Sequence, residues 1–142
     1  MSRVPSALVV AALVTLALTG CTMPNLTHAR TTGTAESVRA LELGWRTAAS
    51  QPEWVPADAT GIRFAATTSG PADETPAEVL VTTASPLPRT CTTAARTSSA
   101  RLGEHWAPAT VPDRVERCGN WAVVPVQGGW YGWTPFAPTH LG

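Results

Sequence analysis

Residues 121 to 135 read WAVVPVQGGWYGWTP, and the predicted fold is built outward from this stretch. Two short runs rich in aromatic and β-branched residues flank a central Gln-Gly-Gly sequence at 127–129. Because glycine adopts a positive φ without steric cost, this centre favours a tight turn between antiparallel strands. Pro125 donates no ladder hydrogen bond, so its strand is expected at a sheet edge or beside a bulge. The stretch therefore predicts a β-hairpin.

A second hairpin is predicted upstream, where apolar residues recur with a period of two. Residues 61–68 (GIRFAATT) alternate in this way, and residues 77–84 (AEVLVTTA) are rich in residues that favour strands. The turn-forming sequence SGPADETP lies between them. Residues 92–113 have only weak periodicity and are predicted to form a loop or one short helix.

Residues 34–50 (TAESVRALELGWRTAAS) are expected to form a helix. Thr34 offers an N-cap and Pro52 ends the pattern, while Glu42 and Arg46 are spaced for an i,i+4 ion pair. The apolar side chains that share one helical face are Val38, Leu41, Trp45 and Ala48. Together the segments predict an α+β fold, with one N-terminal helix packed on a small antiparallel sheet of about four strands.

Composition excludes several functional classes. The 142 residues suit one modest domain, and ten basic residues, all arginine, balance ten acidic ones. Because the chain has no excess of positive charge to bind phosphates, no nucleic-acid partner is expected. The motifs GxSxG, HExxH, Walker A and GxGxxG are absent, and His105 is the one histidine expected within the domain. Glu104 and His105 could form an acid and base pair, but adjacent residues usually point apart, so a solvated loop is expected there. We expect no enzymatic activity, cofactor or metal.

The N-terminus has the features of a secretory signal. Arg3 precedes an apolar stretch at residues 7–18 (ALVVAALVTLAL), which is shorter than the ~20 residues of a membrane-spanning anchor, the alternative interpretation. Residues 18–21 (LTGC) resemble the bacterial lipobox. The resemblance implies that Cys21 receives a diacylglyceryl group and becomes the first residue after cleavage. The protein would then be lipid-anchored at the outer face of the cytoplasmic membrane.

The lipobox divides the chain and accounts for its odd number of cysteines. Residues 1–20 would be the signal peptide, residues 21–33 a Thr-rich tether, and residues 34–142 the folded domain. An odd cysteine in a secreted chain needs a separate explanation, and lipidation of Cys21 supplies it. The remaining Cys91 and Cys118 are expected to form a structural disulfide. A metal or redox site is the alternative, although no CxxC motif is present.

Residues 45–135 also resemble small uncharacterised lipoproteins and secreted proteins of actinomycetes. The stretches that carry this resemblance are WVPADATGI (54–62), SPLPRTC (85–91), CGNW (118–121) and GGWYGWTP (128–135). The resemblance implies pairing of Cys91 with Cys118, and it offers no activity that could be carried over to this chain.

The aromatic residues of the C-terminal hairpin are the candidate ligand contacts. Along a strand, Tyr131 and Trp133 would share one face and Trp130 would lie on the other. These rings either fill the core or form an exposed face that stacks on sugar rings or on a partner surface. We expect a lipid-anchored binding module for an envelope ligand such as a glycan. The alternative is a structural or accessory envelope protein that binds a membrane protein partner, and burial of Tyr131 and Trp133 separates the two.

Overall fold

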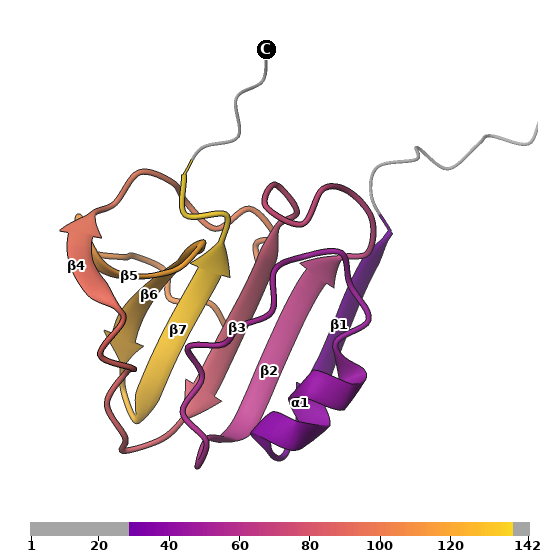
Figure 1. Cartoon of the computed structure of the whole chain (residues 1–142), viewed down its shortest axis with the longest axis horizontal. Helices are drawn as coiled ribbons and strands as arrows, with labels where there is room; N and C mark the ends of the chain where they lie inside the picture. The colour runs from indigo at the N-terminus through magenta and orange to yellow at the C-terminus, as the bar shows by residue number, and fades with distance from the viewer. Residues whose placement is uncertain (1–28, 138–142) are drawn as a thin grey trace, which may run out of the picture.

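The computed structural model describes residues 29–137, which form one seven-stranded antiparallel sheet and a short helix (Figure 1). The sheet order is β1-β2-β3-β7-β6-β5-β4. The elements are β1 (Arg30–Ala35), α1 (Val38–Gly44), β2 (Thr60–Thr67), β3 (Ala77–Thr82), β4 (Thr92–Ala95), β5 (Arg114–Cys118), β6 (Trp121–Val126) and β7 (Gly129–Thr134). The predicted signal peptide and Cys21 lie outside the described residues. No helix among residues 29–137 is long and apolar enough to cross a membrane.

Both predicted hairpins are present, and β7 joins them into one sheet. Strand β7 pairs with β6 of its own hairpin and with β3 of the upstream hairpin. Gly128 in the β6–β7 turn has a φ of 79°, which glycine adopts readily. Pro125 pairs with Trp130, whereas the pairing of β6 with β5 stops at Val123. Pro125 therefore lies beyond the β5 ladder, where its missing N–H leaves no β5 partner unsatisfied.

The predicted α+β fold with about four strands is wrong. The helix covers only Val38–Gly44, because Ser37 rather than Thr34 caps it, with the Ser37 hydroxyl accepting from the Ala40 N–H at 3.1 Å. The preceding residues form strand β1, which takes up part of the predicted tether and the predicted helix start. Its threonines favour strands but are polar, so apolar periodicity does not reveal them. Strands β4 and β5 extend the opposite side of the sheet.

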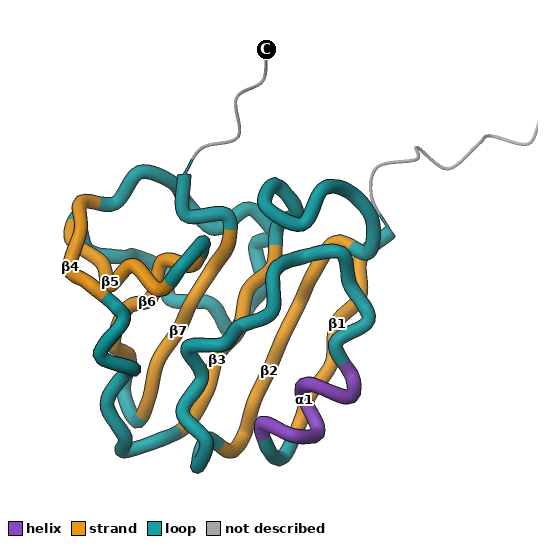
Figure 2. The backbone as a smooth tube through the Cα atoms, in the orientation of Figure 1, coloured by secondary structure: helices purple, strands orange, loops and turns teal. Residues whose placement is uncertain are grey.

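Each face of the sheet carries its own core and its own covering layer. On one face lie α1 and residues 45–59, here called the helix layer, and Figure 2 shows this segment crossing in front of the strands. On the other face lie residues 96–113, here called the strap, which form neither helix nor strand. Apolar residues of the helix layer pack on Ile62, Phe64, Val79 and Trp121, and those of the strap pack on Val124, Tyr131 and Trp133.

The predicted disulfide between Cys91 and Cys118 is confirmed, with a Cα–Cα distance of 4.4 Å. It joins the residue before β4 to the last residue of β5. Cys118 is buried in the core beneath the helix layer, and Cys91 packs against that core. The bridge therefore connects the β4–β5 side of the sheet to the larger of the two cores.

Candidate functional site

The three aromatic residues of β7 lie on the faces that their spacing predicted, but they belong to the core. Tyr131 and Trp133 face the strap, and each is only 1% exposed. Trp130 packs against the opposite core and donates from Nε1 to the Ser85 carbonyl at 3.0 Å. Trp133 Nε1 donates to the Ser98 hydroxyl of the strap at 3.0 Å. Tyr131 and Trp133 thus do not form the exposed stacking face considered from the sequence, because the strap covers them.

Glu78 is a buried carboxylate that the sequence reasoning missed. It lies on β3, is 1% exposed, and accepts from the Tyr131 hydroxyl at 2.6 Å and from the Leu102 N–H at 2.9 Å. Burial, followed by the hydrogen bond to Glu78 and the charge of Glu78, raises the pKa of Tyr131 well above its usual range. The sequence contained one signal for this position. Glu78 lies two residues before Leu80 in the same strand, so both side chains point to the face that the strap covers.

A second charged residue holds the strap at the same point. The Arg30 guanidinium on β1 donates to the Leu102 carbonyl and forms an ion pair with Glu104. Leu102 is therefore held through its N–H by Glu78 and through its carbonyl by Arg30. A cleft of about 540 Å³ lies between strap and sheet. Both Glu78 oxygens accept hydrogen bonds and Glu104 is paired with Arg30, so these carboxylates serve to fix the strap.

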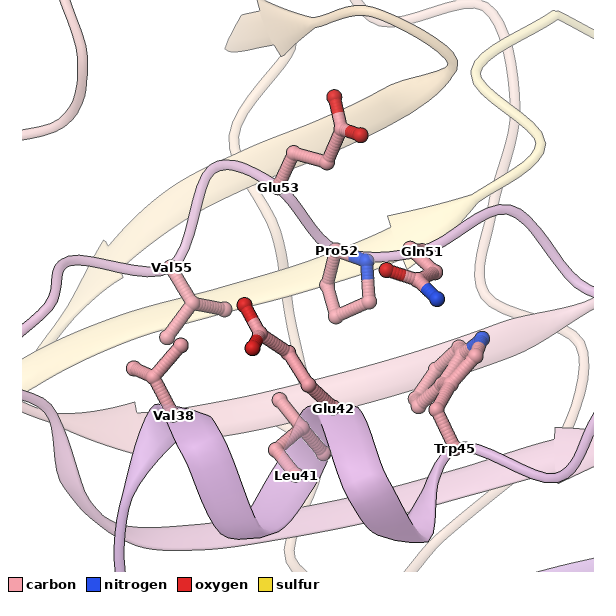
Figure 3. A pocket seen from close by; sticks show the side chains of 8 residues that line it. All are labelled: Val38, Leu41, Glu42, Trp45, Gln51, Pro52, Glu53 and Val55. Carbon is pink, nitrogen blue, oxygen red and sulfur yellow. The ribbon is translucent and has the colours of Figure 1, made fainter.

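A small pocket opens on the other face, between α1 and residues 51–55. It has a volume of about 80 Å³, and we call it the helix-side pocket. Its lining residues are Val38, Leu41, Glu42, Trp45, Gln51, Pro52, Glu53 and Val55 (Figure 3). The apolar members form the interior. In Figure 3 the Glu42 carboxylate lies over the space between helix and loop, whereas the Glu53 carboxylate points away.

Local structure explains why this pocket forms. The helix ends at Gly44, and Trp45 Nε1 donates to the Ala49 carbonyl at 3.1 Å, which turns the chain back toward the helix. The Val55 N–H then bonds the Pro52 carbonyl at 3.2 Å and closes a turn opposite α1. Because the helix stops before Arg46, the i,i+4 ion pair of Glu42 and Arg46 predicted from the sequence is not formed among residues 29–137. Glu42 therefore remains exposed beside an apolar pocket.

The remaining candidates from the sequence are a metal site and His105. Among residues 29–137 no group of three or more His, Cys, Asp or Glu side chains is placed to hold a metal ion. His105 is exposed on the strap, next to the paired Glu104. Comparisons of the chain with protein-family models, with curated proteins and with solved structures found no match.

Proposed function

We propose that this protein is a bacterial lipoprotein, anchored through Cys21 to the outer face of the cytoplasmic membrane, that acts by binding a protein partner in the envelope and not by catalysis. The lipobox at residues 18–21 and the apolar stretch before it support the anchor. The disulfide between Cys91 and Cys118 supports an extracytoplasmic location, because such bonds persist in oxidising compartments.

The burial of Tyr131 and Trp133 is the observation that favours a protein partner over a glycan. Stacking on a sugar ring requires an exposed aromatic face, and both rings are 1% exposed. The helix-side pocket has a volume of about 80 Å³, below the roughly 300–1,000 Å³ of small-molecule sites. The cleft of about 540 Å³ under the strap falls within that range, but Glu78 and Glu104 beside it are engaged in holding the strap. A space as small as the helix-side pocket suits one side chain of a larger partner.

The position of the pocket relative to the anchor is compatible with this role. In Figure 1, β1 starts at the upper edge of the sheet and α1 lies near its lower edge. The six residues of β1 span roughly 17–20 Å at the usual rise of a strand. In the proposed arrangement, α1 would thus lie further from the membrane than the start of β1, where a partner domain can reach it.

Replacing Cys21 by serine tests the anchor. The full chain with Cys21→Ser should remain an uncleaved, unacylated precursor, because a hydroxyl does not replace the thiol nucleophile. Intact mass and radiolabelled palmitate incorporation measure this in a lipoprotein-processing bacterium. A Cys21→Ser protein that is still cleaved and acylated would refute the anchor.

Photocrosslinking in intact cells tests the partner. A photoreactive residue at Leu43, which is 70% exposed on α1, should give one discrete protein adduct, whereas the same group at the exposed Arg114 on β5 should not. Excess chain without the photoreactive group should compete the adduct away. Saturable binding of cell-wall glycan fragments without any protein adduct would overturn the protein-partner proposal.

A further inference from the structure

The helix-side pocket combines an apolar interior with a carboxylate that the fold leaves without a cation. Neither Glu42 nor Glu53 has a salt bridge or a side-chain hydrogen bond to another residue of the described range 29–137. The spacing of Glu42 and Arg46 would allow a pair in a longer helix, but Arg46 follows the helix end and its N–H bonds the Gly44 carbonyl at 2.8 Å. The pocket therefore offers an unmatched negative charge beside apolar walls.

The volume of the pocket limits what can enter it. About 80 Å³ exceeds the roughly 10–15 Å³ that one water needs and is far below the size of a usual small-molecule site. A single side chain with a long apolar stem and a charged end matches both the walls and the charge. Arginine and lysine have this form, since their methylenes pack on apolar surface while the charged end reaches a carboxylate. The planar guanidinium of arginine also stacks on an aromatic ring, and Trp45 lines the pocket.

We infer that the helix-side pocket receives an arginine side chain of the partner protein, with its methylenes between Leu41, Trp45 and Val55 and its guanidinium at the Glu42 carboxylate. This inference rests on the proposed function and adds the chemistry of the contact. Glu53 lies on the rim and contributes less, because its carboxylate points away from the pocket.

Two matched probes test the charge requirement with the full chain in detergent micelles. N-acetyl-arginine methylamide should shift the Trp45 indole N–H resonance in a saturable way, with a dissociation constant on the order of millimolar for so small a ligand. N-acetyl-citrulline methylamide has nearly the same shape without the charge and should bind about fivefold more weakly or worse. Equal binding of both probes, or no saturable shift with the arginine probe, would overturn the inference.

Three glutamate variants test the position of the charge. Glu42→Gln should weaken binding of the arginine probe about fivefold, Glu53→Gln should weaken it about twofold or less, and Glu36→Gln, an exposed control before the helix, should leave it unchanged. All three keep the size of the side chain and lie at exposed positions, so folding is not at risk. Unchanged binding in Glu42→Gln would refute the assigned contact.

A lipid headgroup is the competing source of a cation near a membrane. Phosphoethanolamine, used as a headgroup probe, should not displace the arginine probe, because it lacks the long apolar stem. Displacement at equal concentration would overturn the inference in favour of the headgroup. A crosslinked protein adduct at Leu43 that forms equally well in Glu42→Gln would refute the arginine contact and leave the proposed function standing. Binding of the arginine probe without any protein adduct in cells would refute the protein-partner function and leave only the finding that the pocket accepts an arginine side chain.

Discussion

The two faces of the sheet are covered by layers that are held in different ways. The helix layer is held by apolar packing, with the Trp121 ring centroid 6.3 Å from that of Trp45 and 6.0 Å from that of Trp54. The strap is held largely by polar groups, since Glu78 and Arg30 both bind it at Leu102. The difference follows from composition, because the strap carries one aromatic residue, Trp106, and two large aliphatic ones, Leu102 and Val111, among small and polar residues.

This difference shows how a segment with little apolar surface can still cover a core. Hydrogen bonds to a charged group contribute about 1.5–3 kcal/mol, enough to replace the burial of roughly one large apolar side chain. The Trp106 and Tyr131 rings, 6.3 Å apart, add an apolar contact, and Ala100, Ala107 and Val111 of the strap also pack on this core. The strap is therefore fixed at a few points, whereas the helix layer is fixed by a continuous packed surface.

The largest expected effect is a loss of stability when the packing beneath the helix layer is removed. Trp121→Ala should lower the free energy of unfolding by about 3–5 kcal/mol, because it leaves a cavity beneath Trp45 and Trp54. Urea unfolding of the full chain in micelles, followed by far-UV circular dichroism, measures this. Trp106→Ala on the strap is the matched control, and its loss should be clearly smaller because Trp106 is only partly buried. Equal losses in both variants would remove the proposed difference between the layers.

Removing the buried carboxylate should release the strap. Glu78→Ala leaves the Tyr131 hydroxyl and the Leu102 N–H without their acceptor, at a cost of about 2–4 kcal/mol. Glu78→Gln keeps an acceptor and should lose less. Hydrogen exchange should accelerate at Leu102 well before it accelerates in the helix layer. Simultaneous acceleration in both layers would show that they open as one unit.

The single tyrosine, Tyr131, lies beneath the strap and should make the stability of the protein depend on pH. The folded-state pKa of Tyr131 is raised, so Tyr131 contributes fully to stability below the unfolded pKa of about 10 and loses this contribution as the pH rises further. The chain has one tyrosine and no lysine, so no other phenol and no amine side chain titrates in this range.

Urea midpoints between pH 8 and 11 measure this dependence. The unsubstituted chain should lose stability above about pH 10, because only its unfolded state releases the tyrosine proton. Tyr131→Phe should be less stable by about 1–2 kcal/mol at pH 8 and should then show a flatter profile. A decline of the same slope in Tyr131→Phe would mean that Tyr131 is not its cause.

The smallest expected effect concerns Arg30, the more exposed of the two charged residues that hold the strap at Leu102. Arg30→Ala removes the ion pair with Glu104 and the bond to the Leu102 carbonyl. The Arg30 side chain is 40% exposed but that of Glu104 only 11%, so the loss should be about 1 kcal/mol, at the upper end for exposed pairs. In 0.5 M salt the difference from the unsubstituted chain should shrink, since screening weakens an exposed pair. A salt-independent loss of several kcal/mol would place Arg30 among the core contacts.

The sequence by itself determined the two hairpins, the face assignments along β7 and the disulfide pairing. The hairpins and the face assignments depend on short-range rules, because glycine sets the turn at Gly128 and successive strand residues point to opposite faces. The disulfide pair follows instead from cysteine parity once Cys21 is set aside. The same short-range rules placed Tyr131 and Trp133 together and Trp130 apart. Alternation reports which side chains share a face and carries no information about what covers that face.

The tertiary structure alone decided the number of strands, the length of the helix and whether Tyr131 and Trp133 are buried or exposed. Strand β1 is polar and becomes a strand by pairing with β2. Because this pairing extends to Ala35, the helix begins only after Ser37. The strap has only weak periodicity, which does not place it over Tyr131. It lies there because Glu78 and Arg30, 24 and 72 residues away in sequence, bind Leu102. Contacts between residues so distant form only when the whole sheet is assembled, which is why they decide burial, and with it the candidate site.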